Sequence, residues 1–226
     1  LEGLDQLENA VESYQKALKI NPDFSEAYNN LGNVFKELGQ LDNAVESYQK
    51  ALEINPDYPA LHNNLGNAYK ELGQLNDALK SYLKGLTYNP DYTNLLNNLG
   101  VVFFDLGQLD EAVKSYERAI ALNPNYAEAY NNLGATFNKL GQLENAIQSY
   151  DKALTINPDF TEPHNNLTII YKKQGLINDV ISSTKKAIDS MVKELTINPH
   201  DADTHNNLGI AYYEIERLDD AVQSYQ

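Results

Sequence analysis

The sequence repeats itself with a period of 34 residues, and this period limits the possible fold more than any other feature. The dipeptide Asn-Pro begins at five positions that are 34 residues apart and at a sixth that follows after 41 residues: Asn21, Asn55, Asn89, Asn123, Asn157 and Asn198. The tripeptide Asn-Asn-Leu follows the same spacing, beginning at Asn29, Asn63, Asn97, Asn131, Asn165 and Asn206. A period of this length is typical of stacked helical repeats, each packed only against its neighbours. We therefore expect an all-α array.

Each repeat contains two segments of helical spacing separated by a glycine. In residues 25–58, apolar residues recur every three or four positions up to Leu38, and the same spacing resumes at Leu41. Gly39 lies between the two segments and is suited to a left-handed helix stop, whereas Pro56 follows the second segment. The repeat is therefore predicted to be a helix, a short turn and a second helix, which we call helix A and helix B.

The order of large and small residues resembles the tetratricopeptide repeat family. That family places a large residue, Leu, Gly, an aromatic residue, Ala, an aromatic residue, Ala and Pro at fixed steps, which are here Tyr28, Leu31, Gly32, Phe35, Ala44, Tyr48, Ala51 and Pro56. Residues 59–92 follow with His62, Leu65, Gly66, Tyr69, Ala78, Tyr82, Gly85 and Pro90. The resemblance implies tandem helix-turn-helix repeats stacked into a right-handed superhelix, an α-solenoid. In such arrays helix A builds a concave wall that commonly binds extended peptides or partner helices.

The repeat boundaries predict a single array over residues 1–226. Residues 1–24 correspond to helix B of a partial repeat, and the regular repeats are 25–58, 59–92, 93–126 and 127–160. Residues 161–201 form an irregular repeat, and 202–226 a partial repeat whose helix B is expected to begin at Asp219 and Asp220. Neither end has the polar cap that such arrays normally carry. We expect either that flanking residues are missing or that another molecule covers the ends, as in end-to-end self-association.

The irregular repeat differs from the others in composition and in length. Three of its core positions are changed, and the residues that now occupy them are Thr168, Val180 and Thr184. It also carries seven extra residues around positions 188–194. Seven residues make nearly two helical turns, so they can lengthen helix B without turning its apolar face away from the core. We predict a helix B of about 20 residues with Met191 and Leu195 on its apolar stripe. The insertion is either tolerated without a function or forms a ridge or bend that a partner uses.

Charge and composition exclude several classes of function. The chain has 32 acidic and 17 basic residues and a formal net charge of −15, so it is expected to repel nucleic acids. It has no cysteine, which excludes disulfides, thiolate nucleophiles and cysteine-ligated metals. No apolar run is long enough to cross a bilayer, and we expect no membrane insertion.

No catalytic or metal-binding motif accompanies the repeats. His62, His164 and His205 stand at a helix-A position that holds Tyr or Leu in the other repeats, so we interpret them as packing residues. The sequence has no glycine-rich phosphate loop, no calcium loop and no His-Glu-x-x-His motif. We therefore expect no catalytic residue, no metal site and no cofactor within these residues.

The candidate binding residues are helix-A positions outside the buried stripe. The second Asn of each Asn-Asn pair recurs once per repeat along the predicted groove, as Asn30, Asn64, Asn98, Asn132, Asn166 and Asn207. We call this row the Asn ladder. A primary amide both donates and accepts hydrogen bonds, so the ladder can pair with the backbone of an extended peptide whatever its side chains. The alternative is that these amides bond neighbouring helices or water.

A second row of groove positions becomes less polar toward the C-terminus. One turn after the Asn ladder, successive repeats carry Asn33, Asn67, Val101, Ala135, Ile169 and Ile210. Phe104 is the candidate apolar anchor, because Phe103 takes the core aromatic position and leaves Phe104 to face outward beside Val101. The alternative for Phe104 is a contact with an adjacent helix.

These features favour a non-catalytic scaffold that binds a peptide or protein segment in the concave groove. The repeats also resemble those preceding the catalytic region of O-linked N-acetylglucosamine transferases, so a substrate-recruiting arm of a larger enzyme is an alternative. A self-assembling structural array is another.

Repeats that clamp the acidic tails of chaperones use Lys and Arg together with Asn, and the equivalent places here supply amides alone: Asn29, Asn33, Asn64, Asn94 and Asn98. Without those cations, a terminal carboxylate gains no charge-assisted pairing.

Overall fold

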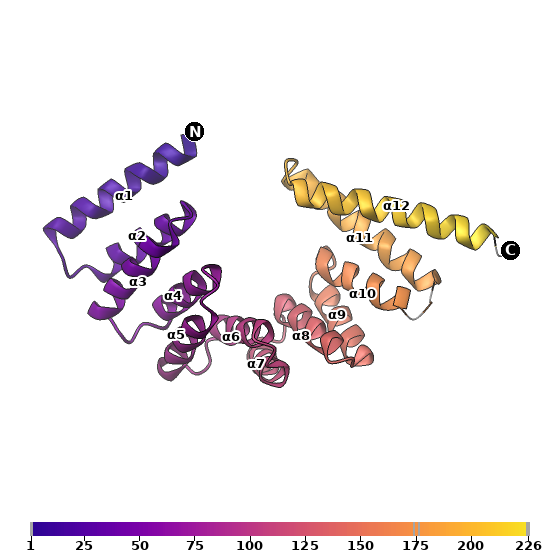
Figure 1. Ribbon diagram of the computed structural model, residues 1–226, viewed down its shortest axis with the longest axis horizontal. Helices are drawn as coiled ribbons and strands as arrows, with labels where there is room; N and C mark the ends of the chain where they lie inside the picture. Colours follow the sequence, from indigo (N-terminus) through magenta and orange to yellow (C-terminus); the bar gives the residue numbers. More distant parts are fainter. Residues whose placement is uncertain (1, 174, 176, 225–226) are drawn as a thin grey trace. The chain divides into compact units, whose positions relative to one another are not determined.

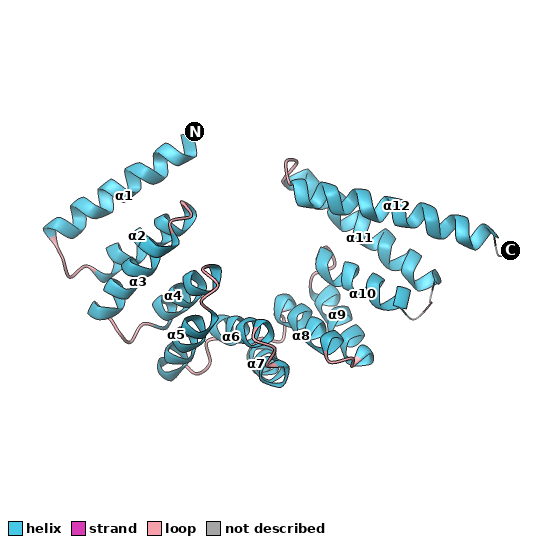
Figure 2. Ribbon diagram, viewed as in Figure 1, coloured by secondary structure: helices cyan, strands magenta, loops and turns pink. Residues whose placement is uncertain are grey.

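The computed structural model describes residues 2–173, 175 and 177–224, and every regular element among them is an α-helix (Figure 2). In chain order the helices are α1 (Glu2–Ile20), α2 (Ser25–Glu37), α3 (Leu41–Ile54), α4 (Pro59–Glu71), α5 (Leu75–Tyr88), α6 (Thr93–Asp105), α7 (Leu109–Leu122), α8 (Ala127–Lys139), α9 (Leu143–Ile156), α10 (Thr161–Lys173), α11 (Ile177–Ile197) and α12 (Ala202–Ser224). The all-α fold class is therefore confirmed. Within the described residues, none of these helices combines the length and the hydropathy that a bilayer span requires.

Consecutive helices pack as antiparallel pairs, each made of helix A and helix B of one repeat (Figure 1). The chain divides into two compact units, residues 1–122 and 123–226. In the first unit α2, α4 and α6 also contact one another in succession, whereas no contact joins α3 to α5 among its described residues. In the second unit α8 contacts α10. Helices A thus form one continuous side in each unit, which we call the helix-A wall.

The glycine turns end helix A as predicted. Gly39 has φ +70°, and Gly73, Gly107, Gly141 and Gly175 are also in the left-handed region. The Gly39 N–H donates to Lys36 O over 2.9 Å, and the Gln40 N–H donates to Phe35 O over 2.8 Å. These two bonds are those of a Schellman motif, which satisfies the last carbonyls of the helix and reverses the chain.

Each regular repeat buries one tyrosine of helix B against a glycine of helix A. Tyr48, Tyr82, Tyr116 and Tyr150 are at most 1% exposed. A Cβ atom added at Gly32 would lie 2.6 Å from Tyr48 Cε1, so no larger residue fits there without moving the ring. The predicted roles of Gly32 as the site of close approach and of Tyr48 as the core residue are confirmed.

The Asn-Pro dipeptides shape the turns between repeats. The side-chain Oδ1 of Asn21, Asn89, Asn123 and Asn157 accepts a hydrogen bond from the backbone N–H two residues later, over 3.2–3.3 Å. This is an Asx turn, in which the side chain substitutes for a backbone acceptor. One of the two sets of recurring asparagines therefore has a structural role.

The lengthened helix B of the irregular repeat is present. Helix α11 has 21 residues, against 14 in α3, α5, α7 and α9, as the insertion predicts. Met191 is buried and Leu195 is partly buried. Ala187, Ile188 and Met191 form a core cluster with Ala211 of α12. The added turns therefore pack against the next helix and keep the apolar face in register.

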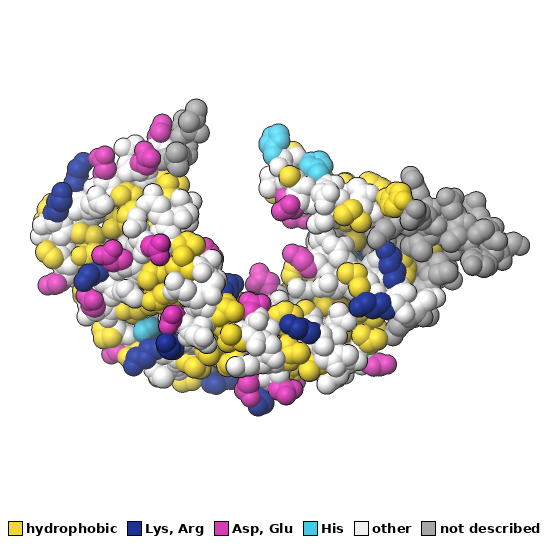
Figure 3. Space-filling model, in the orientation of Figure 1, with side chains coloured by type: hydrophobic (Ala, Val, Ile, Leu, Met, Phe, Trp, Pro, Cys, Tyr) yellow, Lys and Arg dark blue, Asp and Glu magenta, His cyan; other side chains and the backbone are white. Residues whose placement is uncertain are grey.

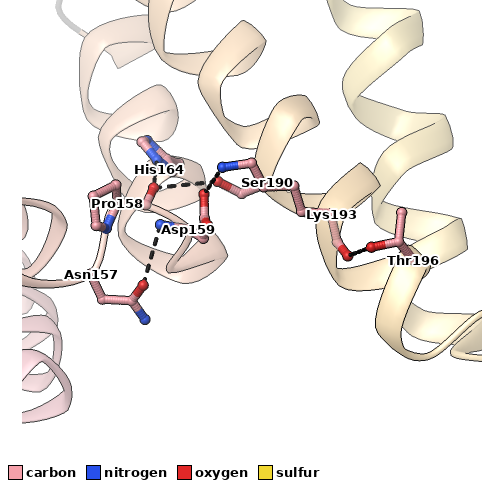
Figure 4. Close-up of polar contacts among 7 residues, drawn as sticks. All are labelled: Asn157, Pro158, Asp159, His164, Ser190, Lys193 and Thr196. Carbon is pink, nitrogen blue, oxygen red and sulfur yellow. Dashed lines mark hydrogen bonds and ion pairs between the residues drawn. The ribbon is translucent and has the colours of Figure 1, made fainter.

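The loop before α10 is tied to the added turns of α11 (Figure 4). Lys193 Nζ lies 2.5 Å from Asp159 Oδ1, and Ser190 Oγ donates to Pro158 O over 3.5 Å. In a regular repeat, Arg118 of α7 makes the corresponding contact, donating to Pro90 O over 2.7 Å. Lys193 lies seven residues beyond the position equivalent to Arg118. The insertion therefore moves this contact along the helix by about two turns on the same face.

Helix α12 differs from the prediction. A second helix was expected to begin at Asp219 and Asp220, but α12 runs without a break from Ala202 to Ser224. The position of the turn glycine is occupied by Glu216. Glycine adopts the left-handed conformation that ends helix A at little cost, whereas other L-residues do so only with strain, so the chain continues as a helix.

Candidate functional site

All predicted site residues lie on the helix-A walls. In the first unit they are partly buried on α2, α4 and α6: Asn30, Asn33, Asn64, Asn67, Asn98, Val101 and Phe104. In the second unit Asn132 and Asn166 are partly buried on α8 and α10, and Asn207 is exposed on α12. The predicted site residues therefore lie on helices A in both units.

The Asn ladder bonds neighbouring repeats in the first unit. Asn64 Nδ2 donates to Asn29 Oδ1 over 2.9 Å, and Asn98 Nδ2 donates to Asn63 Oδ1 over 2.9 Å. Thus the second Asn of one pair bonds the first Asn of the preceding pair, which is the neighbouring-helix alternative. Each bond uses one amide N–H and fixes the orientation of the side chain.

The second row of asparagines bonds the core tyrosines. Tyr48 OH donates to Asn33 Oδ1 over 2.7 Å, and Tyr82 OH donates to Asn67 Oδ1 over 2.6 Å. Asn98 Nδ2 adds a bond to Asn67 Oδ1 over 3.2 Å. The carbonyl groups of Asn33 and Asn67 are therefore used inside the array, a role that sequence reasoning missed. The only sequence signal is that Asn and Tyr occur together, 15 residues apart, in these repeats.

Burial makes the core tyrosines Tyr48 and Tyr82 still harder to ionise. Desolvation raises the pKa of Tyr48, and the nearby carboxylates of Glu71 and Glu37 raise it further. Desolvation likewise raises the pKa of Tyr82, with a smaller contribution from Glu71. Both phenols therefore remain hydrogen-bond donors throughout the physiological pH range.

The corresponding network is incomplete in the second unit. Tyr150 OH and Asn131 Oδ1 are buried and have no hydrogen-bond partner among the described residues. Ala135 stands where Asn33 and Asn67 stand in the earlier repeats, so no amide accepts from Tyr150. Leaving a buried hydroxyl without a partner costs about 1–3 kcal/mol relative to a satisfied one.

The apolar part of the first wall lies on α6. Phe103 packs against the core cluster that contains Tyr82 and Leu99, as expected for the core aromatic position. Phe104 is partly buried and lies outside that cluster. Its role as an anchor for a ligand stays a prediction.

Charges on the walls are mixed in sign. Lys36 Nζ of α2 lies 3.5 Å from Glu71 Oε1 of α4, so a cation and an anion pair across the first wall. Over the face shown in Figure 3, Lys and Arg side chains are interspersed with Asp and Glu. Such a surface does not concentrate charge of one sign toward a ligand.

Two of the three helix-A histidines are packing residues. His62 Nε2 lies 2.8 Å from Pro56 O and His164 Nε2 lies 3.1 Å from Pro158 O, and both rings are buried. Burial lowers the pKa of both histidines. His205 makes the same contact with Pro199 O, but it is exposed, because among the described residues no further helix covers it. The packing interpretation is therefore wrong for His205.

The described residues contain no group of three or more His, Cys, Asp or Glu side chains arranged to hold a metal.

Models of known protein families match the chain continuously from residue 4 to residue 160. A model described as TPR repeat matches residues 4–39, 32–73, 66–107 and 102–141, and one described as Tetratricopeptide repeat matches residues 127–160. No curated protein sequence matches the chain significantly.

Several solved structures are similar to this one. MamA has 29% identity and a TM-score of 0.67, with 74% of this chain and 97% of MamA covered. YrrB, described as a TPR protein with an unusual peptide-binding site, has 25% identity and a TM-score of 0.63, covering 80% of this chain and 93% of YrrB. TTC0263, a thermophilic TPR protein of Thermus thermophilus, has the same fold, with 24% identity, a TM-score of 0.67 and coverage of 84% and 99%. Because the family models cover more than half of the chain, the protein belongs to the tetratricopeptide repeat family, whose repeats typically serve as scaffolds for protein–protein interaction.

Proposed function

We propose that the helix-A wall of a unit binds an extended polypeptide segment and that the Asn ladder supplies the contacts to its backbone. The observation that carries this proposal is the pair of bonds Asn64–Asn29 and Asn98–Asn63, each 2.9 Å long. These bonds hold partly exposed amides in one orientation. The peptide-binding site in the name of YrrB, a protein 25% identical to this chain, supports the same class of ligand.

Asn64 retains an N–H and a carbonyl oxygen that a ligand can use, whereas Asn98, whose Nδ2 donates twice, retains its carbonyl oxygen. An amide has two N–H donors and one carbonyl oxygen, and the bond from Asn64 to Asn29 uses one donor of Asn64. The second N–H and Oδ1 of Asn64 can pair with a C=O and an N–H of an extended peptide. Since the protein itself already restrains the amide, binding loses less side-chain entropy. Backbone pairing of this kind gives affinity with little demand on the ligand's sequence.

The test is a double substitution, Asn64→Ala with Asn98→Ala. Peptides are first selected on the wild-type chain from a random-sequence phage library, and the affinity of a synthetic selected peptide is measured by fluorescence anisotropy. Each lost hydrogen bond is worth about 0.5–1.5 kcal/mol, so the double variant is expected to bind roughly tenfold more weakly. Unchanged affinity in a folded variant would contradict the proposal.

A matched control removes two asparagines of helix B. Asn43 and Asn145 are exposed on α3 and α9, and each bonds a glutamine of its own repeat over 2.9 Å. The pair Asn43→Ala and Asn145→Ala is expected to leave peptide affinity unchanged. Thermal unfolding of both double variants separates a loss of binding from a loss of stability, because the ladder bonds also join repeats.

Light scattering on the same samples tests self-association. If the chain forms oligomers that the selected peptide dissociates, the natural occupant of the wall is a second copy of this chain. A constant monomer mass, with and without peptide, supports a separate polypeptide partner.

A further inference from the structure

A pocket of about 150 Å³ opens on the helix-A wall of the second unit, between α10, α11 and α12. Its lining combines apolar residues, Ile169, Ile210 and Ala211, with Thr168 of α10, Thr184 of α11 and the polar residues Asn165, Lys172 and Asn207. Ile169 and Ile210 are 48% and 51% exposed, so the apolar part of the lining is accessible from the wall.

The pocket occupies the place that a tyrosine fills in the regular repeats. Thr184 stands at the position of Tyr48, and Thr168 stands at the position of Gly32, against which the Tyr48 ring packs. Ala211 corresponds to Ala68, a member of the core cluster that contains Tyr48. A short threonine in place of the ring therefore leaves a space that the same surrounding positions enclose.

The size of the pocket and the isoleucines in its lining favour a ring over a short aliphatic side chain. A cavity of about 150 Å³ is the size that accommodates benzene. At the position of Ile169, the regular repeat has Asn33, which accepts the tyrosine hydroxyl over 2.7 Å. Here isoleucines flank the ring-sized space, and Thr184 Oγ1 lies 3.5 Å from Thr168 Oγ1. Because Thr168 Oγ1 donates to His164 O over 2.9 Å, its remaining lone pair can accept a hydrogen bond.

We propose that this pocket receives one aromatic side chain, Tyr or Phe, of a polypeptide segment bound on the helix-A wall of the second unit. The proposal rests on the proposed function and adds a specificity element to it. The Asn ladder provides contacts that any backbone can make, whereas the pocket selects one residue type and fixes the register of the ligand. The ring takes the place of the tyrosine that the irregular repeat lacks.

The first experiment tests the pocket without any peptide. p-Cresol, the side-chain analogue of tyrosine, is titrated into the full chain, and methyl groups are followed by NMR. Shifts are expected for Ile169, Ile210 and Thr184, and not for Ile147 on α9. Absence of shifts up to the solubility limit of p-cresol would overturn the proposal, whether or not peptides bind elsewhere on the wall.

A variant that restores the regular core closes the pocket. Thr168→Gly, Ile169→Asn and Thr184→Tyr together recreate the Gly–Asn–Tyr set of the repeat at 25–58, and p-cresol binding is expected to disappear. Ile210→Asn is the second variant: its site is about half exposed, so it cannot disrupt the core, and it should weaken p-cresol binding at least threefold. Val192→Ala, another exposed apolar site on α11, is the control and should have no effect.

The second experiment uses a selected peptide that binds the wall. Replacement of its aromatic residue by Ala is expected to weaken binding about tenfold or more on the wild-type chain, and by less than twofold on the closed variant. If substitution of ladder asparagines weakens binding but the aromatic residue does not matter, the pocket proposal is wrong and the wall proposal stands. If p-cresol binds in the pocket but substitution of the ladder asparagines leaves the affinity of selected peptides unchanged, the pocket proposal stands and the proposed backbone contacts are wrong.

Discussion

The regular repeat at 25–58 and the irregular repeat at 161–201 build the same helix pair with different interiors. The regular repeat places the Tyr48 ring on Gly32 and bonds its hydroxyl to Asn33 on the wall. The irregular repeat places two threonines in contact, Thr168 and Thr184, and lengthens helix B to 21 residues. The arrangement in the regular repeat fills the core and places an amide on the wall, whereas the irregular repeat leaves a ring-sized pocket lined by both apolar and polar residues.

The comparison shows that the core and the wall are coupled through one side chain. Tyr48 is a core residue, yet its hydroxyl determines how the wall residue Asn33 is oriented. In the irregular repeat the tyrosine and the amide are both replaced, by Thr184 and Ile169, whereas the repeat of Tyr150 keeps the ring and lacks only the amide. In the repeats that pair Tyr with Asn, a change in the interior is therefore expected to alter how the amide is presented on the wall.

The largest effect is expected when the threonine pair of the irregular repeat is introduced into the core of the regular repeat. Gly32→Thr forces a side chain into the Tyr48 ring and is expected to cost at least about 1–3 kcal/mol. Tyr48→Thr removes a fully buried ring and is expected to cost about 3–5 kcal/mol. The double variant recreates the threonine pair of the irregular repeat, so its loss should be smaller than the sum of the single losses by about 0.5–3 kcal/mol. Urea unfolding followed by far-UV circular dichroism measures all three free energies of unfolding.

If the loss of stability in the double variant equals the sum of the two single losses, the contact between the two threonines does not offset the loss of the Gly–Tyr contact in this repeat. The control is a second double variant, Gly32→Thr with Tyr116→Thr, whose two positions do not touch. These residues belong to different repeats, so their effects are expected to add.

An intermediate effect is expected from two tyrosine hydroxyls in otherwise similar sites. Tyr82→Phe removes a hydroxyl that donates to Asn67 over 2.6 Å and should cost about 1 kcal/mol. Tyr150→Phe removes a buried hydroxyl without a partner and should be neutral or stabilising. Thermal and urea unfolding of the two variants give the comparison directly.

A substitution that adds an amide beside Tyr150 tests whether the missing acceptor explains the difference between Tyr82 and Tyr150. Ala135→Asn places an amide where Asn67 stands in the earlier repeat, so it should stabilise the chain and make Tyr150→Phe costly in that background. If Tyr150→Phe is as destabilising as Tyr82→Phe in the natural sequence, Tyr150 OH has a partner in solution and the contrast between the repeats is wrong.

The turns, the core residues and the lengths of most helices could be predicted from the sequence, and the side-chain contacts between helices could not. Gly39, Tyr48 and the length of α11 follow from helical spacing and from the chain's own repetition. The bond from Asn64 to Asn29 depends on how closely successive helices A approach, which spacing along one helix does not encode. The pocket beside Thr184 was missed for the same reason, since the threonine substitution was visible but the enclosing residues come from three helices. The continuous α12 had a local signal, Glu216 in place of glycine.

The smallest effect is expected from the buried histidines, and it depends on pH. Burial lowers the pKa of His62 and His164 in the folded chain, whereas an unfolded histidine has a pKa of about 6.5. Between the folded and unfolded values, the unfolded state binds more protons, so stability falls as the pH falls through about 6.5 and stops falling below the folded pKa. Replacing both residues by Leu, which occupies this position as Leu96, should flatten the stability profile between about pH 7.5 and pH 5.5. Urea midpoints across this range measure the profile, and equal slopes for the two chains would show that carboxylates, not these histidines, control it.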